Sequence, residues 1–221
     1  MQMDVELTLT EPMLGTKPDD PKVFESFVAS KAPNDDKRKQ ELESMEHVER
    51  AGTTRFARDE TGFKLFAYQI EGCLKDKGET LRQCNPKLGA EEGRRGKKWG
   101  AIKSKIDRFL CVYPIGKPYG RDIYLLDDKG KPKKAADGSC ERPLRAETMQ
   151  GPRVTLARSE TVAAGTRLRF TIDVLDGSPI SREMVKQMLD MGQRRGLGQW
   201  RNAGNGRFTW KELKSKKTKR K

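Results

Sequence analysis

Apolar and polar residues alternate along many stretches of this 221-residue chain, which predicts a protein built largely of strands. Residues 4–10 alternate regularly and are followed by Pro12 and Gly15, so we expect a strand there with one buried face. Similar patterns predict further strands at residues 53–58, 63–70, 105–113, 122–126, 142–148, 153–159 and 166–175.

Apolar residues at helical spacing predict helices between these strands. We expect a short amphipathic helix at residues 23–29 and a charged helix at residues 36–50, which together carry most of the acidity, and a further helix at residues 72–83. The last helix begins at Ser181, whose hydroxyl is a typical N-cap, and runs to about Arg195. Its apolar stripe, typical of a core face, consists of Met184, Val185, Met188, Leu189 and Met191.

The chain is long enough to bury one full core, so we expect a single α+β domain at residues 1–210. The stretch 85–142 begins with a basic, glycine-rich loop and matches no pattern that we can name, so we interpret it as a basic loop or hairpin insertion. Residues 211–221 form a basic tail that we expect to be disordered. Hydrophobic residues make up only 34% of the chain, which indicates a modest core.

Positive charge is concentrated after residue 50. Residues 1–50 carry a net charge of −5 and the whole chain carries +14, so the later residues carry +19. This excess indicates nucleic acid as the partner, because the basic runs lack the large apolar residues of a membrane-binding surface. No apolar run reaches the roughly 18 residues of a membrane helix. We therefore expect a cytoplasmic protein without a membrane partner.

The cysteines are scattered through the chain. Cys73, Cys84, Cys111 and Cys140 show no Cys-x-x-Cys spacing and have no adjacent histidine. We therefore expect reduced thiols, no zinc site and no cofactor.

The segment from Gly196 to Phe208 carries four glycines in a loop between the last helix and a final strand. Glycine permits positive φ and lets a polymer approach the main chain, while arginine and asparagine side chains offer donors to an anion. A tight buried turn without a ligand explains the glycines equally well. The candidate nucleic-acid contacts of this region are Arg194, Arg195, Gly196, Gly198, Trp200, Arg201, Asn202, Gly204, Gly206 and Arg207.

Three segments, taken in order, resemble the RAMP superfamily, the repeat-associated RNA-binding proteins of CRISPR effector complexes, and are most similar to their backbone subunits. Leu7-Thr-Leu-Thr-Glu-Pro-Met-Leu-Gly15 resembles the first strand of that family with its proline or glycine motif. Tyr68-Gln-Ile-Glu-Gly-Cys-Leu-Lys75 is similar to the family's junction into a helix, with its glycine and lysine. Residues 166–208 resemble its closing strand, helix and glycine-rich loop.

The resemblance implies a ferredoxin-like, RNA-recognition-type antiparallel sheet with helices on one face. It also implies single-stranded nucleic acid as the ligand, with RNA favoured, and contacts from glycine-loop N–H groups and basic side chains to phosphates. The protein partners that it implies are further copies in a homo-oligomer or CRISPR effector subunits. Outside the glycine-rich loop, the candidate nucleic-acid contacts are Lys75, Arg94, Arg95, Lys97, Lys98, Arg145 and Arg153.

Two alternatives fit the same resemblance. One is an endoribonuclease, because some RAMP proteins cut RNA with a histidine and some backbone subunits use an aspartate of an N-terminal loop with a divalent metal. The other is a virus-encoded mimic or interaction protein of a CRISPR complex. The single histidine, His47, lies on the acidic helix, away in sequence from the basic residues. We assign no catalytic or metal-binding residue, since no motif distinguishes among the N-terminal aspartates Asp19, Asp20, Asp35 and Asp36.

Overall fold

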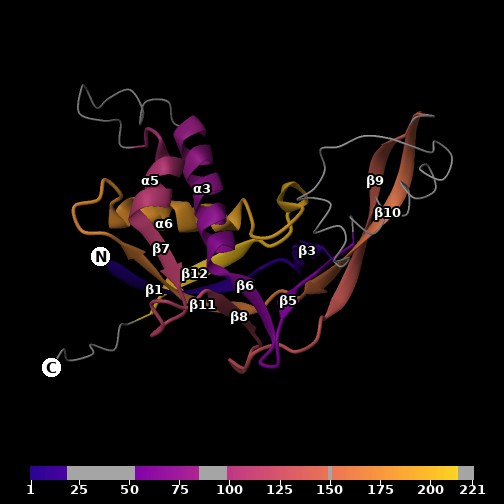
Figure 1. Cartoon of the computed structure of the whole chain (residues 1–221), viewed down its shortest axis with the longest axis horizontal. Coiled ribbons are helices and arrows are strands. Elements are labelled where there is room, and N and C mark those ends of the chain that lie inside the picture. The colour runs from indigo at the N-terminus through magenta and orange to yellow at the C-terminus, as the bar shows by residue number, and fades with distance from the viewer. Residues whose placement is uncertain (19–52, 85–98, 149–150, 214–221) are drawn as a thin grey trace, which may run out of the picture.

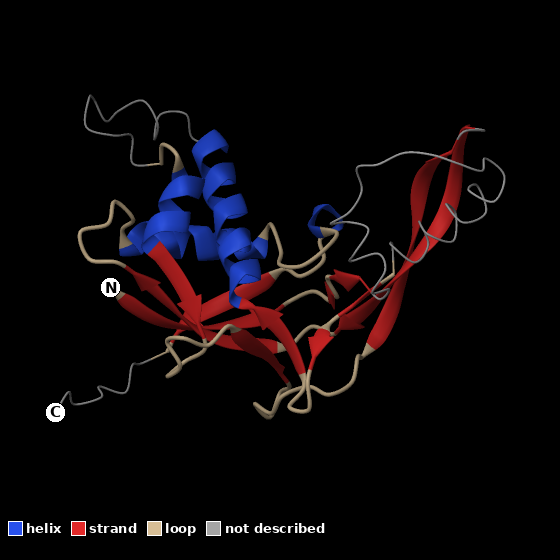
Figure 2. Ribbon diagram, in the orientation of Figure 1, coloured by secondary structure: helices blue, strands red, loops and turns tan. Residues whose placement is uncertain are grey.

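The chain forms an α+β fold in which helices cover one face of an antiparallel sheet (Figures 1 and 2). Some predictions concern residues outside the described part of the chain: the helices at residues 23–29 and 36–50, most of the loop before Trp99, and most of the basic tail. The computed structural model describes residues 1–18, 53–84, 99–148 and 151–213.

The larger sheet is centred on β1 (Gln2–Leu9) and β11 (Arg167–Val174), which pair antiparallel along almost their whole length. Every second side chain of both strands is apolar and buried, as the alternation in the sequence predicts. Val5 and Phe170 lie directly opposite each other in this buried layer. The strands predicted at residues 4–10 and 166–175 are therefore confirmed.

Five further strands of the described residues complete this sheet. β12 (Phe208–Glu212) pairs with the other edge of β1. The second edge of β11 pairs with β7 (Leu110–Tyr113) at one end and with β8 (Asp122–Leu126) at the other. β6 (Phe63–Phe66) and the short β5 (Ala57–Arg58) extend the sheet beyond β8. All pairs in this sheet are antiparallel, as expected for its class.

The apolar face of the larger sheet is covered by α3 (Ala67–Cys84), α5 (Ile102–Phe109) and α6 (Arg182–Asp190) (Figure 2). α3 contacts both of the other helices. Trp99 is fully buried in the core that the helices form with the sheet. Among the residues that the structure describes, no helix is long and apolar enough to cross a membrane.

The start of α6 is confirmed and its end is corrected. The Ser181 hydroxyl accepts a hydrogen bond from the Met184 N–H at 3.3 Å, so Ser181 is the N-cap. The helix does not reach Arg195, because a 3-10 turn at Met191–Gln193 follows Asp190 directly. Gly192 in this turn lies against the Phe208 ring of β12, which a Cβ atom would meet at 2.2 Å.

The strand predicted at residues 63–70 is wrong in its second half. β6 stops at Phe66, and α3 begins at the next residue. Gln69 caps this start, because its Oε1 accepts a hydrogen bond from the Phe66 N–H at 2.8 Å. The helix predicted at residues 72–83 is therefore one turn longer at its N-terminal end.

The strand predicted at residues 105–113 is also wrong in its first half, where α5 is found. Ile102 and Ile106, which lie one helical turn apart, are both fully buried, so packing favours the helix. Gly78 of α3 makes room for this contact, since a Cβ atom there would lie 2.9 Å from Ile102 Cγ1. Within the stretch 85–142, α5, β7 and β8 thus belong to the helical layer and the larger sheet.

A long hairpin dominates the second sheet. It consists of β9 (Gly138–Thr148) and β10 (Gly151–Val162), which pair continuously along their length. The hairpin projects away from the helices and the larger sheet (Figure 1). The strands predicted at residues 142–148 and 153–159 are confirmed, and both are longer than expected.

Short strands from earlier parts of the chain complete the second sheet at the base of this hairpin. β2 (Met13–Leu14) and β4 (Thr54–Arg55) both pair with β10 near its end, and β3 (Lys17–Pro18) pairs with β4. The strand predicted at residues 53–58 is thus divided between two sheets, because β4 joins this one and β5 joins the larger one. Phe56, which lies between them, is buried.

Candidate nucleic-acid interface

The two ends of the glycine-rich loop pack against each other and against the segment that follows β1. Gly206 N–H donates to the Pro12 carbonyl at 2.8 Å, and Leu197 N–H donates to the Gly206 carbonyl at 2.8 Å. A Cβ atom on Gly206 would lie 1.9 Å from the Leu197 oxygen, and one on Gly196 would lie 2.1 Å from the Asn205 oxygen. These two glycines are therefore required by backbone packing, whether or not a ligand binds.

The tip of the loop turns through left-handed backbone conformations. Gly198 and Gly204 have φ values of 88° and 89°, which glycine adopts without strain. Trp200 also has a positive φ, 50°, which is uncommon for a residue with a bulky side chain. Its carbonyl accepts hydrogen bonds from the Ala203 N–H at 3.1 Å and from Asn205 Nδ2 at 3.3 Å. The loop thus holds Trp200 in a conformation that such residues rarely adopt.

Arg142, near the base of the hairpin, contacts this tip. Its Nη2 donates a hydrogen bond to Gln199 Oε1 at 2.9 Å, and its guanidinium carbon lies 5.9 Å from the centroid of the Trp200 ring. Its Nε is buried without a hydrogen-bond partner among the described residues. Trp200 nevertheless remains 43% exposed, so part of its ring is open to a ligand. The hairpin and the loop therefore form one continuous surface.

Two arginines of the loop region share one carboxylate of α3. Arg201 Nη1 lies 3.0 Å from Asp76 Oδ2, and Arg195 Nη2 donates to Asp76 Oδ1 at 3.2 Å. Burial alone would raise the pKa of Asp76, but the hydrogen bond from Arg195 and the charges of both arginines outweigh it and lower the pKa below its ordinary value. Asp76 thus fixes both guanidinium groups on the surface and offsets part of their charge.

A buried lysine lies beneath the loop. Lys77 of α3 is fully buried, its Nζ donates to the Gly196 carbonyl at 3.4 Å, and it lies 4.8 Å from the centroid of the Phe208 ring. Lys75, which the sequence pattern favours instead, forms an ion pair with Asp107 of α5. Helical spacing could have identified Lys77, because it continues the buried series of Ile70 and Leu74.

A small pocket of about 290 Å³ opens between α3 and the loop. Gln69 Nε2 donates to Thr16 Oγ1 at 2.7 Å on one side of it. Gly72, in the helix, has no atom within 4 Å of the place where a Cβ atom would stand, so its missing side chain leaves this pocket open. The pocket is lined by Thr16, Leu65, Gln69, Gly72, Cys73, Leu197, Gly198 and Arg201.

Acidic side chains on the face of the larger sheet that lies away from the helices have partners within the protein. Glu6 is only 1% exposed, although it is a carboxylate, and it forms ion pairs with Arg169 and, at 2.8 Å, with Lys211. Thr171 Oγ1 donates to Asp4 Oδ1 at 2.6 Å on the same face. Arg169 and Lys211 of this face are therefore paired with an acidic group within the protein.

The remaining loop candidates are exposed. Arg194, Asn202 and Arg207 lie at the surface, and neither arginine has an ion-pair partner among the described residues. The Arg207 guanidinium lies beside Gly204, within 3.4 Å of the position that a Cβ atom would take. Two cationic groups without an acidic partner among the described residues thus lie at the loop.

Other candidates lie on the hairpin or outside the described residues. Arg145 and Arg153 occupy neighbouring register positions on β9 and β10. The N-terminal aspartates and His47 lie outside the described residues, and so do the candidate contacts Arg94, Arg95, Lys97 and Lys98.

No model of a known protein family matches this chain, and no curated protein matches its sequence. Solved structures to which this chain is similar include a chain of a type IV-B CRISPR complex, with a TM-score of 0.43 and 13% identity over 98% of this chain and 92% of that one. A chain of a type III-B Cmr-beta complex bound to cognate target RNA matches with a TM-score of 0.41 and 12% identity. That match covers 96% of this chain and 58% of the other, so this chain spans little more than half of its length.

Proposed function

We propose that this protein binds single-stranded nucleic acid, with RNA as the favoured ligand. The binding surface in this proposal consists of the base of the β9–β10 hairpin, the glycine-rich loop at residues 196–207 and the adjoining side of α3. The observation that carries the proposal is the contact of Arg142 with Gln199 and the partly exposed Trp200, which joins the hairpin to the loop.

The chemistry of this surface suits a strand of nucleotides. A base stacked on an exposed tryptophan contributes about 1–3 kcal/mol, and every base has a face that can stack. Arg194 and Arg207 have no acidic partner among the described residues, so both can neutralise phosphates. Arg142 adds a cation beside the stacking ring. We propose Lys75, Arg145 and Arg153 as additional contacts along the strand.

We also propose that the core is a ferredoxin-like unit of the RAMP type. In this proposal β1, the pair α3 and α5, β7, β11, α6 and β12 form its βαββαβ order, and the strand order β12-β1-β11-β7 supports it. The hairpin is then an addition between β8 and β11. Assembly with further copies or with CRISPR effector subunits along a guide RNA belongs to the same proposal.

Fluorescence anisotropy with matched single-stranded RNA, single-stranded DNA and duplex, titrated across salt, tests this function. We expect RNA to bind most tightly, with a steep dependence on salt. Trp200→Ala should weaken binding by about 1–3 kcal/mol with little change in that dependence. Arg207→Ala should flatten the slope of log K against log salt by about 0.7.

Arg108→Ala is the matched control, because Arg108 is an exposed arginine on α5. It should lower affinity less than Arg207→Ala. Equal losses in both arginine variants would show that net charge alone governs binding. An unchanged affinity in Trp200→Ala and Arg207→Ala would remove the loop from the interface.

A further inference from the structure

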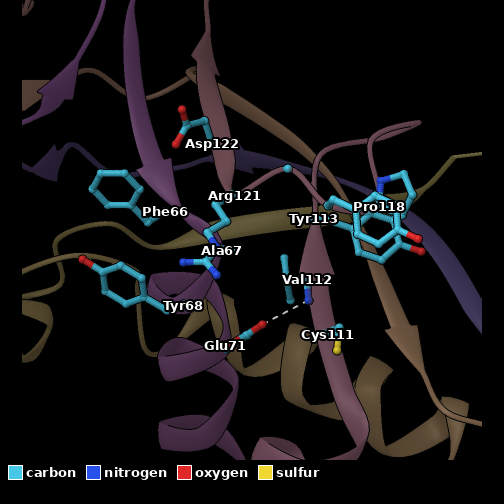
Figure 3. A pocket seen from close by; sticks show the side chains of 12 residues that line it. Phe66, Ala67, Tyr68, Glu71, Cys111, Val112, Tyr113, Pro118, Arg121 and Asp122 are labelled. Carbon is cyan, nitrogen blue, oxygen red and sulfur yellow. Dashed lines mark hydrogen bonds between the residues drawn. The ribbon is translucent and has the colours of Figure 1, made fainter.

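A second hollow, of about 800 Å³, lies on another side of α3, at its N-terminal end (Figure 3). Tyr68 and Glu71 of the helix line it, whereas Gln69 and Gly72 line the pocket beside the glycine-rich loop. Successive helical residues point about 100° apart, so the two hollows occupy different flanks of the helix. The remaining walls come from β7 and from the connection between β7 and β8, and the volume lies within the usual range of ligand pockets.

Aromatic side chains stand on both sides of this hollow. The Phe66 and Tyr68 rings stack with their centroids 5.6 Å apart and their planes 10° apart. Tyr68 is nevertheless 64% exposed, so a further flat ring can add to the stack on its outer face. Tyr119, on the connection before β8, is 96% exposed and also lines the hollow. Figure 3 shows Phe66 and Tyr68 on one side and Tyr113 and Pro118 on the other.

The acidic groups of the hollow are occupied by partners within the protein. Asp122 forms an ion pair with Lys64 at 2.8 Å, and Glu71 Oε1 accepts a hydrogen bond from the Val112 N–H at 3.1 Å. Burial and the charge of a neighbouring carboxylate raise the pKa of Tyr113 to about 12, so its hydroxyl stays neutral. The charge of Asp122 is therefore offset by a lysine, whereas the hydrogen-bond donor to Glu71 is a neutral backbone N–H.

Arg121 is the exception among these charged groups. Its side chain extends into the hollow between the aromatic walls (Figure 3), and its guanidinium has no ion-pair or hydrogen-bond partner among the described residues. Lys117 lies on the same connection and lines the adjoining hollow, again without an ion-pair partner in the described part of the chain. An open aromatic face beside an unpaired guanidinium suits a ligand that is both flat and anionic.

We propose that this hollow binds a nucleoside monophosphate unit, whose base stacks on the outer face of Tyr68 and whose phosphate pairs with Arg121. The unit can be a free nucleotide or one nucleotide of a strand, since both present the same base and phosphate. The site uses none of the residues of the surface at the glycine-rich loop. It therefore stands or falls independently of the function proposed above.

Calorimetric titration of the full-length protein with adenosine 5′-monophosphate, adenosine and ribose 5-phosphate tests the site. We expect adenosine 5′-monophosphate to bind more tightly than either fragment. Tyr68→Leu removes the stacking face but keeps an apolar side chain, and it should weaken adenosine 5′-monophosphate binding about 5- to 150-fold. Arg121→Gln should weaken it about 10- to 150-fold and leave adenosine binding unchanged.

Arg108→Gln is the control, and it should bind adenosine 5′-monophosphate as the unmodified protein does. A 5′-phosphorylated adenosine pentamer that binds more tightly than the mononucleotide, and loses this advantage in Tyr68→Leu, would assign the ligand of the hollow to a strand. Equal affinity, or an advantage that persists in Tyr68→Leu and so belongs to the glycine-rich loop, would assign it to a free nucleotide. The proposal is overturned if ribose 5-phosphate binds as tightly as adenosine 5′-monophosphate, or if Tyr68→Leu has no effect. It is also overturned if no nucleotide binds. If Tyr119→Ala then disrupts self-association, the hollow serves a protein contact instead.

Discussion

Two glycine-to-alanine changes that add the same methyl group should alter stability in opposite directions. Gly206 has a φ of 68°, and a Cβ atom there would lie 1.9 Å from the Leu197 oxygen. The left-handed conformation costs a non-glycine residue about 1–2 kcal/mol, and overpacking of a tight site costs about 1–3 kcal/mol. Hydrogen bonds at 2.8 Å on both sides of Gly206 resist any shift of the backbone. We therefore expect Gly206→Ala to lower the free energy of unfolding by about 2 to 5 kcal/mol.

Gly72 provides the contrast. It lies within α3, and a Cβ atom there would meet no atom within 4 Å. Alanine is favoured over glycine in a helix by about 0.5–1 kcal/mol, so Gly72→Ala should raise the free energy of unfolding by that amount. Gly204→Ala should change the free energy of unfolding by an intermediate amount. Gly204 has a φ of 89°, but the atom nearest to the new Cβ belongs to the Arg207 side chain, 3.4 Å away. It should cost about 1–2 kcal/mol.

Urea unfolding of the three variants under identical conditions, followed by circular dichroism, measures these differences. Gly204→Ala retains a measurable transition even where Gly206→Ala yields no folded protein, so the ranking can still be determined. Two outcomes contradict this expectation: Gly206→Ala is as stable as the unmodified protein, or Gly72→Ala is more destabilised than Gly206→Ala. Either result would mean that the loop glycines are not fixed by backbone packing.

Two further substitutions test the charged groups. Asp76→Asn should steepen the slope of log K against log salt for RNA binding by about 0.7, because Arg195 and Arg201 lose an offsetting charge. The amide oxygen of the new side chain can still accept their hydrogen bonds. An unchanged slope in anisotropy titrations would argue against contact of these arginines with phosphate. Burial favours a higher pKa for Glu6, but the interactions with Lys211 and Arg169 outweigh it and lower the pKa below its ordinary value of 4.5. The Glu6 carboxylate therefore stabilises the fold above pH 4.5, and this contribution is lost progressively as the pH falls below that value. Glu6→Gln should therefore lower the free energy of unfolding at pH 7 by about 1.5–3 kcal/mol, and the variant should lose less stability than the unmodified protein between pH 7 and pH 3. If the urea midpoints of both proteins fall by the same amount between pH 7 and pH 3, Glu6 does not have this role.

Features that depend on local patterns could be predicted from the sequence. The alternation around Val5 and Phe170 identifies both central strands, because one face of each is buried and the other is not. Ser181 marks the start of α6 because a cap depends only on residues within one turn.

Short elements were harder to predict, because their conformation is decided by packing. α5 has eight residues, which is too short for helix propensity to determine its structure. Ile106 is buried in either conformation, so the apolar pattern alone is ambiguous, and the contact of Ile102 with Gly78 depends on residues far apart in the sequence. The boundary after Phe66, where β6 ends and α3 begins at the next residue, could not be predicted from the local pattern either.

The candidate interface could be predicted only in part. The glycine-rich loop is visible in the sequence, but the roles of its glycines differ. Only the structure separates Gly206, which backbone packing requires, from Gly204, where a Cβ atom would approach only the Arg207 side chain. Arg142 could not be identified, because no sequence pattern connects the base of the hairpin with Trp200. Whether a basic residue is free or paired is likewise a property of the fold.

Cross-linking of 4-thiouridine-labelled single-stranded RNA to the nuclease-treated protein, followed by mass spectrometry of the peptides, tests the central proposal most directly. We expect cross-links in peptides that span residues 194–207 and the hairpin at residues 138–162, with Trp200 among the modified residues. Cross-links confined to the sheet face around Glu6 and Lys211, or no cross-links at low salt, would contradict the proposal that the glycine-rich loop and the hairpin together bind RNA.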